Sequence, residues 1–310
     1  MKRQIYFVLL LLILFIIFTR CERTESINIR DNAFLDALIE QGVDTDGDGV
    51  ISQSEAEVVL TLDVSRSGIS DITGIESFVN LEELNCEDNE LTDLDISNIT
   101  SLKCLYLWGN QLTSLDVSNI GGLLILRCSW NQLTSLDVSE NYKLKELRCE
   151  GNQLTTLDIS NNSDLIHLIC NDNQLTNLDV SRNVSLGYLA CFRNFLTTLD
   201  FTNNYYIQEL YCGENLLTHL DLSQQSRLTH LCCGCSTHSL SECERSNLLT
   251  SLDISNNLNL RLLWLINMPT LTQVCVWELP FPPLRPGNVP RPQVDTEGSP
   301  NIFFTTECSK

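Results

Sequence analysis

The chain has 310 residues, of which 43% are hydrophobic and 19% charged, and its formal net charge is −21. A chain this acidic is unsuited to binding nucleic acids or anionic lipid surfaces, and it suits an exported protein or a cationic partner. The four histidines are scattered, and the sequence contains no nucleophile motif and no catalytic pair, so we do not expect an enzyme.

The N-terminal segment predicts export. A basic start precedes an apolar run to Phe18, which is short for a membrane helix and typical of a secretory signal. We assign residues 1–20 to this signal. Cys21 follows directly and resembles the lipid-attachment cysteine of bacterial lipoproteins, although Arg20 stands where a small residue is usual. We therefore expect a lipid anchor at Cys21, with plain secretion or an uncleaved anchor as the alternatives.

Residues 21–60 are expected to form an N-terminal segment and a helical cap around one calcium loop. The sequence matches the EF-hand loop at every ligand position, with Gly49 at the sharp turn. Carboxylates this close repel one another without a cation; an acidic surface turn is the alternative. Because the sequence has one such loop, we expect a single structural Ca²⁺ that helps to close the first repeat. The predicted ligands are Asp44, Asp46, Asp48, the Val50 carbonyl, Ser52 and Glu55.

A repeating sequence covers residues 61–274. The stretch Cys128-Ser-Trp-Asn-Gln-Leu-Thr-Ser-Leu-Asp-Val-Ser recurs in similar form from Cys149, 21 residues later, and again from Cys170, Cys191 and Cys212. A fixed period of this length indicates a solenoid, and the unit fits the leucine-rich-repeat pattern L-x-x-L-x-L-x-x-N-x-L with Cys for one Leu. About nine such repeats predict a curved parallel β-sheet on the concave side and an extended or 3₁₀-like convex side.

Two positions of the repeat are expected to form ladders. Cysteine occupies an inward position, and we interpret these residues as buried thiols because Leu107 and Leu265 replace them in two repeats; disulfides or a metal site are the alternatives. An asparagine three residues later can hydrogen-bond the backbone of the following turn. The cysteines are Cys86, Cys128, Cys149, Cys170, Cys191, Cys212 and Cys233, and the asparagines are Asn89, Asn110, Asn131, Asn152, Asn173, Asn194 and Asn215.

Two segments depart from the repeat. An insertion at residues 234–246 contains Cys235 and Cys243, for which we predict a loop-closing disulfide, with a zinc site as the alternative. Residues 275–310 are rich in proline and lack the repeat register, so we expect an irregular C-terminal cap. Cys275 and Cys308 flank this tail, and we predict a disulfide between them.

Outward positions of the predicted concave strands carry aromatic and basic side chains on adjacent repeats. Such a row has the composition of an interface; the alternative is that several of these side chains cover neighbouring strands. The predicted binding residues are Tyr106, Trp108, Arg127, Trp130, Arg148, His167, Tyr188, Phe192, Arg193, Tyr211 and Trp264.

Together these motifs resemble internalin-like bacterial leucine-rich-repeat proteins, and more closely the exported repeat lipoproteins of Bacteroidetes-type bacteria. The resemblance covers residues 30–275. It implies a monomeric, non-enzymatic protein of the outer membrane or cell surface, or else a secreted one. Such a protein is expected to bind a protein or glycan on its concave face. A passive structural envelope lipoprotein without a specific partner is the alternative.

Overall fold

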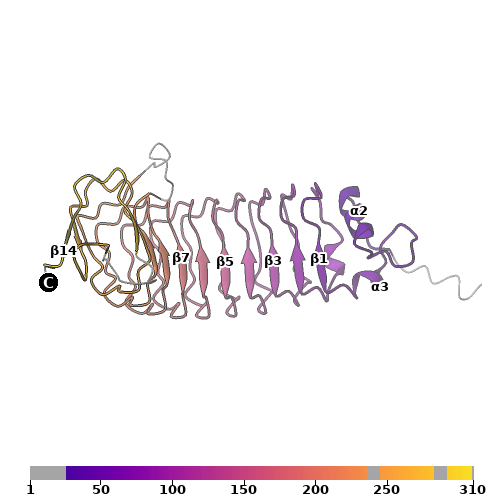
Figure 1. Cartoon of the computed structure of the whole chain (residues 1–310). Helices are drawn as coiled ribbons and strands as arrows, with labels where there is room; N and C mark the ends of the chain where they lie inside the picture. The colour runs from indigo at the N-terminus through magenta and orange to yellow at the C-terminus, as the bar shows by residue number, and fades with distance from the viewer. Residues whose placement is uncertain (1–25, 236–244, 283–291, 309–310) are drawn as a thin grey trace, which may run out of the picture.

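The computed structural model describes residues 26–235, 245–282 and 292–308. Over these ranges the chain winds into an elongated stack of short parallel strands, with two helices at the N-terminal end and the C-terminus at the opposite end (Figure 1). The predicted signal segment, Cys21 and Cys243 lie outside the described residues. No helix in the described part of the chain is long and apolar enough to cross a membrane.

The leucine-rich-repeat solenoid predicted from the 21-residue period is confirmed. Its main sheet has eleven parallel strands, in the order β1 to β9, β11 and β13. This is more than the nine repeats predicted, because a variant first repeat (β1) and the C-terminal tail (β13) also join the sheet. The strands are β1 (Thr61–Asp63), β2 (Glu83–Asn85), β3 (Cys104–Tyr106), β4 (Ile125–Arg127), β5 (Glu146–Arg148), β6 (His167–Ile169), β7 (Tyr188–Ala190), β8 (Glu209–Tyr211), β9 (His230–Cys232), β11 (Leu262–Trp264) and β13 (Gln293–Asp295).

The interior of the stack is built from the same positions in every repeat. The central leucine of each strand pairs with that of the next, as Leu147 does with Leu168, and points inward while its neighbours point outward. The predicted ladder cysteines follow the strands as buried free thiols, and Leu107 and Leu265 are equally buried. Burial raises the pKa of the Cys128 thiol to about 12. The thiols therefore act as core packing.

The predicted asparagine ladder closes the turn that follows each strand. In a representative repeat, the Asn152 Oδ1 accepts a hydrogen bond from the Leu133 N–H at 3.0 Å. Its Nδ2 donates to the carbonyls of Cys128 and Cys149, both at 3.0 Å. Each asparagine thereby joins its own repeat to the preceding one, and it satisfies backbone groups that the turn would otherwise bury unpaired.

A second buried ladder, which the sequence analysis did not identify, lies in the turns before the strands. The Asn162 Nδ2 donates to the carbonyl of Val138 at 3.0 Å and to that of Asn141 at 2.9 Å. The same position recurs with the 21-residue period, so the signal was present in the sequence. The members are Asn141, Asn162, Asn183, Asn204 and Asn257, with Gln225 in one repeat.

Helix α2 (Asn32–Glu40) covers the open end of the first repeat. It buries Phe34 and Leu38, two of the apolar residues whose helical spacing predicts it. Asp31 caps the helix, since its Oδ1 accepts a hydrogen bond from the Ala33 N–H at 2.7 Å. Its Oδ2 accepts one from the Ser70 N–H at 2.8 Å, so the same carboxylate fastens the cap to the first repeat.

The helix after the calcium loop, α3 (Gln53–Ala56), is a single turn. Val58 and Val59 follow it, and β-branched residues of this kind are poor helix formers. The chain then enters β1 at Thr61.

The C-terminal tail is not the irregular cap that we predicted. Strand β13 extends the main sheet, while β10 (Ser251–Asp253), β12 (Gln273–Cys275) and β14 (Phe303–Thr305) form a second parallel sheet. The tail completes the backbone hydrogen bonding of the last repeats, for example from the Leu265 N–H to the Asp295 carbonyl at 2.8 Å. Among the described residues, the convex side otherwise has only one 3₁₀ turn, η1 (Ile75–Ser77).

The cysteines outside the ladder differ in state. Cys275 and Cys308 are joined by a disulfide, which fastens β12 to the end of the described tail. Cys235 is also disulfide-bonded, while its predicted partner Cys243 lies outside the described residues.

Candidate binding face and calcium loop

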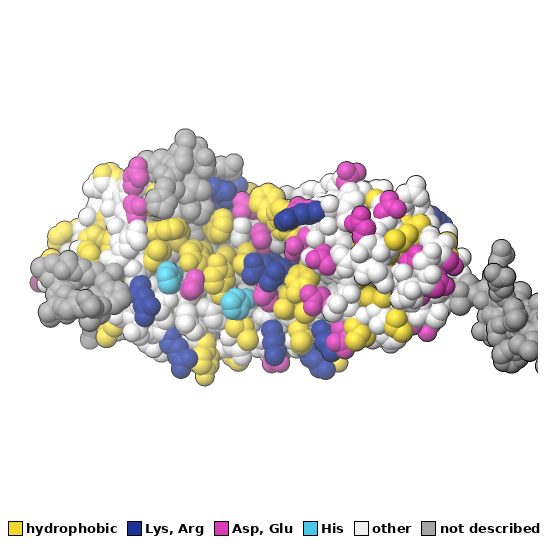
Figure 2. Space-filling view, turned by 45° about the vertical axis from the view of Figure 1, so that its right-hand side comes forward, with side chains coloured by type: hydrophobic (Ala, Val, Ile, Leu, Met, Phe, Trp, Pro, Cys, Tyr) yellow, Lys and Arg dark blue, Asp and Glu magenta, His cyan; other side chains and the backbone are white. Residues whose placement is uncertain are grey.

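We call the outward surface of the main sheet the sheet face. It consists of the residues on either side of each central leucine, together with the two residues that follow each inward cysteine or leucine. The structure places every predicted binding residue, from Tyr106 to Trp264, on this face, and none of them is buried. Figure 2 shows hydrophobic side chains gathered across the middle of the molecule, with histidine, arginine and acidic side chains among them.

Three aromatic side chains form a stack along the sheet face. The rings of His167 and Tyr188 are parallel within 5°, with their centroids 5.7 Å apart, and the Tyr188 and Tyr211 centroids are 5.6 Å apart. They come from the adjacent strands β6, β7 and β8, whose spacing of about 4.8 Å suits ring contact. Burial, and then the negative charge of Glu209, raise the pKa values of both tyrosine hydroxyls. The stack is therefore neutral at its tyrosines.

The basic residues of the sheet face are held by acidic ones. The Glu146 Oε1 accepts hydrogen bonds from Arg127 Nε at 2.8 Å and from Arg148 Nε at 2.7 Å. Although burial opposes its ionisation, these bonds and charges hold the pKa of Glu146 below its usual range. The Arg127 guanidinium also lies over the Tyr106 ring, 5.1 Å from its centroid. This group is consequently a preorganised network.

A second network lies farther along the sheet face. Arg193 lies 3.4 Å from the Asp172 carboxylate and 3.1 Å from that of Glu214, which is buried. Arg193 was predicted from the sequence, whereas its two acidic partners and Glu146 were not. The signal was available, because Asp172 and Glu214 occupy outward positions one repeat before and after Arg193. Glu146 lies one repeat after Arg127 and in the same strand as Arg148.

Trp130 has an unusual backbone conformation for its size. Its φ is 54°, in the left-handed region that bulky residues rarely adopt. The equivalent residues of the two neighbouring repeats are Gly109 and Gly151, both also left-handed. The indole lies against Gly151, where an added Cβ would be 2.7 Å from the ring. Trp130 nevertheless remains 52% exposed, and Trp108 in the preceding repeat is 38% exposed.

In the calcium loop, the structure brings together three of the six predicted ligands. Asp44, Asp46 and Asp48 each offer one carboxylate oxygen, and these atoms lie within 4.8 Å of one another. Backbone N–H groups of the loop hold the carboxylates in place, as the Gly47 N–H does for Asp44 Oδ1 at 2.7 Å. A cluster of oxygen donors on a tight loop fits a hard cation such as Ca²⁺.

Glu55 does not join this cluster. Its Oε1 accepts hydrogen bonds from the Thr45 N–H at 2.7 Å and hydroxyl at 2.8 Å, and its Oε2 accepts one from the Ser52 N–H at 2.9 Å. The Ser52 backbone bond is the largest cause of the low pKa of Glu55, about 2. The adjoining Ile51 is buried, and its carbonyl accepts a 2.8 Å bond from the Ile27 N–H, which ties the loop to the N-terminal segment.

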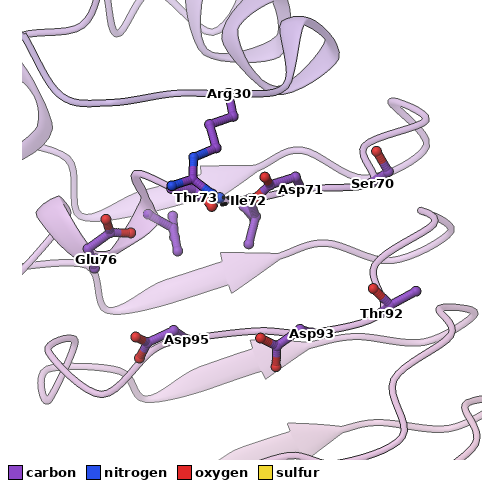
Figure 3. A pocket seen from close by; sticks show the side chains of 10 residues that line it. Arg30, Ser70, Asp71, Ile72, Thr73, Glu76, Thr92, Asp93 and Asp95 are labelled. Atoms are coloured by element: carbon purple, nitrogen blue, oxygen red, sulfur yellow. Dashed lines mark hydrogen bonds between the residues drawn. The ribbon is translucent and has the colours of Figure 1, made fainter.

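A cavity of about 430 Å³ lies where the cap meets the first repeats (Figure 3). The Arg30 side chain extends from the segment before α2 toward Asp71, and Glu76, Asp93 and Asp95 line the other walls. Hydrogen bonds from Thr73 lower the pKa of Asp71. The walls come from the turns on the side away from the strands, so this cavity is separate from the sheet face.

Comparison with known proteins agrees with this architecture. Residues 79–120 match the family model described as leucine-rich repeats (2 copies). A search of curated protein sequences finds no match. The chain is thus a leucine-rich-repeat protein, and its structural neighbours include internalins.

Among solved structures, the functional domain of InlJ from Listeria monocytogenes, described as including a cysteine ladder, is 28% identical, with a TM-score of 0.64. That match covers 90% of this chain and 64% of the other, so this chain spans less than two thirds of its neighbour. An internalin, InlF, from the same organism is 22% identical (TM-score 0.54; 79% and 88% covered). A plant peptide hormone receptor, RGFR1 in complex with RGF2, is 23% identical (TM-score 0.52; 66% and 37% covered). The last two likenesses show the shared fold.

Proposed function

We propose that this leucine-rich-repeat protein is exported to the cell surface and binds a protein partner on its sheet face. The observation that carries the proposal is the stack of His167, Tyr188 and Tyr211 on the outward surface of three adjacent strands. Tyr, Trp and Arg supply most of the binding energy in protein interfaces, particularly where they are held in place before binding. The Glu146 network supplies such positioning beside the stack.

The ring geometry favours a protein over a glycan at the stack. Sugars bind aromatic residues by lying flat on an open ring face. Here the His167 and Tyr188 rings face each other, so each partly covers the other. Ring edges remain to meet a partner, and these suit side-chain and backbone contacts of a protein. The Tyr211 hydroxyl is held by Glu209, to which it donates a hydrogen bond at 3.1 Å.

Calcium has a structural role in this proposal. Asp44, Asp46 and Asp48 would hold the ion, with the Val50 carbonyl, Ser52 and Glu55 as further donors. The ion would neutralise the repulsion among the aspartates and fix the loop that follows helix α2. Because α2 seals the first repeat, calcium would stabilise the end of the stack, where a repeat has no neighbour to bury it.

Export rests on the N-terminal sequence. The proposed signal at residues 1–20 would direct the chain out of the cytoplasm, and lipidation of Cys21 would anchor it to a membrane. Metabolic labelling with a palmitate analogue tests this step, since labelling should disappear on Cys21→Ala.

The double variant Tyr188→Ala/Tyr211→Ala tests the binding face. We expect its binding to host cells or extracellular matrix to fall at least about tenfold, as for loss of interface anchors. The matched control is Tyr142→Ala/Tyr205→Ala, two tyrosines 56% and 50% exposed in the turns before the strands. If both double variants bind like the wild type, the sheet face is not the interface and the passive envelope role is favoured.

A further inference from the structure

A carboxylate near the middle of the sheet face lacks a partner in this chain. The Oε2 of Glu150 is shielded from solvent, and no hydrogen bond or ion pair to the Glu150 side chain occurs among the described residues. Burying a carboxylate oxygen without a donor is costly, because the protein supplies nothing in place of its lost hydration. Such a position is stable only if other parts of the fold impose it, and it is a candidate for ligand contact.

The residue beside it in the preceding repeat has the same deficiency. Ser129 is fully buried, and its Oγ has no hydrogen-bond partner within the described ranges. Ser129 and Glu150 are equivalent positions of adjacent repeats, each directly after a ladder cysteine. Two unpaired polar atoms therefore lie one repeat apart, and that of Ser129 lies beneath the surface.

Two exposed indoles flank these groups. Trp108 is the equivalent residue one repeat before Ser129, while Trp130 follows Ser129 in the chain. The Trp130 N–H donates to the Glu150 carbonyl at 2.8 Å, and its indole lies against Gly151, the residue that follows Glu150. The left-handed backbone of Trp130 recurs at the equivalent residues Asp88 and Asp172, so it belongs to the turn of the repeat.

The chain's own cations do not serve this carboxylate. The nearby arginines Arg127 and Arg148 are both bonded to Glu146, and Arg193 is bonded to Asp172 and Glu214. The chain as a whole has a net charge of −21. Within the part of the chain that the structure describes, no ion pair or hydrogen bond brings a positive group to Glu150, and a partner can supply one.

We propose that Glu150 and the indoles of Trp108 and Trp130 form a site for an arginine or lysine side chain of the partner. The site rests on the proposed function and specifies the chemistry of the partner, which is a basic segment. A guanidinium donates to a carboxylate while its plane stacks on an indole. Rotation of the Glu150 side chain toward the cation exposes the oxygen that is now covered.

The test uses the tryptophan fluorescence of the full chain, titrated with a short peptide carrying four arginines and with the same peptide carrying citrulline. Citrulline keeps the shape and loses the charge. The wild type should bind the arginine peptide at least about tenfold more tightly than the citrulline peptide, and Glu150→Gln should remove about tenfold of that affinity. The control is Asp137→Asn, which makes the same charge change at an exposed aspartate away from the sheet face. Its affinity should change less than twofold.

Thermal unfolding separates binding from structural roles. Because Glu150→Gln removes the charge of a side chain whose Oε2 is covered and unpaired, its melting temperature should equal or exceed that of the wild type. A lower melting temperature would give Glu150 a structural role and overturn the proposal. If Glu150→Gln and Asp137→Asn lost affinity equally, the peptide would bind through the overall negative charge of the protein and the proposal would be overturned. Tighter binding of a neutral oligosaccharide than of the arginine peptide would show that the indoles bind a sugar, and it would overturn the proposal as well.

The two proposals fail in distinguishable ways. If Tyr188→Ala/Tyr211→Ala loses cell binding while Glu150→Gln retains the affinity of the wild type for the arginine peptide, the sheet face is the interface and the cation site is wrong. If Glu150→Gln weakens binding of the arginine peptide while Tyr188→Ala/Tyr211→Ala leaves cell binding unchanged, the cation site is supported and the proposed function is wrong.

Discussion

Replacing Asn152 by alanine should destabilise the solenoid strongly, although the side chain is small. The change removes one hydrogen bond from the Leu133 N–H, two to the carbonyls of Cys128 and Cys149, and a long one of 3.4 Å to the Glu150 carbonyl, which keeps its bond from the Trp130 N–H. The groups of the first three bonds are buried. A single substitution at the ladder position thus removes hydrogen bonds both within a repeat and between that repeat and the preceding one.

The magnitude follows from which groups keep a partner. The Cys128 carbonyl still receives a bond from Asn131 at 3.1 Å, and the Cys149 carbonyl one from Asn173 at 2.9 Å. Their loss costs about 1 kcal/mol each. The Leu133 N–H has no other acceptor among the described residues and becomes a buried, unpaired donor, which costs about 1–3 kcal/mol more. We therefore expect Asn152→Ala to lower the free energy of unfolding by about 3–5 kcal/mol.

Urea unfolding followed by circular dichroism measures this change. The control is Asn161→Ala, because Asn161 is exposed and donates only to the Ser139 carbonyl, at 3.1 Å. It should change the free energy by less than about 0.5 kcal/mol. A loss below about 1 kcal/mol in Asn152→Ala, with an unchanged urea dependence, would refute the claim that the ladder joins the repeats.

Three further predictions concern the cap and the sheet face. Chelation of calcium should lower the melting temperature of the wild type but not of Asp44→Ala, and saturation at a hundredfold excess over Kd is worth about 2.7 kcal/mol; equal sensitivity in both proteins would contradict the site. Because the pKa of Glu55 is lowered from 4.5 to about 2, chiefly by the Ser52 backbone bond, its stabilisation is complete above pH 4.5 and is lost as pH falls through about 2. The free energies of unfolding of the wild type and Glu55→Gln, measured by urea titration, should therefore converge as the pH falls from 4.5 to about 2. A difference that stays constant over this pH range would contradict the prediction. Gly151→Val should destabilise by about 2 kcal/mol or more, because φ is 66° and the new Cβ meets the Trp130 ring; Gly187→Ala, with no neighbour closer than 3.8 Å, should be nearly neutral.

The repeat made most of the fold predictable. Each repeat meets the same environment, so one assignment of inward and outward positions serves them all, and the Cys and Asn ladders follow from it. The tail was mispredicted because β13 and β14 pair with strands about thirty residues earlier through backbone hydrogen bonds, which leave no period in the sequence.

The sequence predicted which residues lie on the sheet face, but it did not predict which of them bond to one another. Alternation along the strands identified Tyr188 and Arg193 as outward residues. It could not show that Glu146 bonds two arginines, or that Glu150 bonds none, because these outcomes depend on side-chain conformations across neighbouring repeats. The Trp130 conformation was hidden for the same reason, although its glycine neighbours in the adjacent repeats were visible in the sequence.

The central claim is that a partner lies on the sheet face, and side-chain footprinting tests it most directly. Hydroxyl-radical oxidation of the protein, free and bound to a cell surface or isolated partner, reports the exposure of individual aromatic residues. Binding should protect Tyr188, Tyr211 and Trp130 while Tyr142 and Tyr205 remain as reactive as in the free protein. Protection of Tyr142 and Tyr205, with Tyr188 and Trp130 unchanged, would contradict the account.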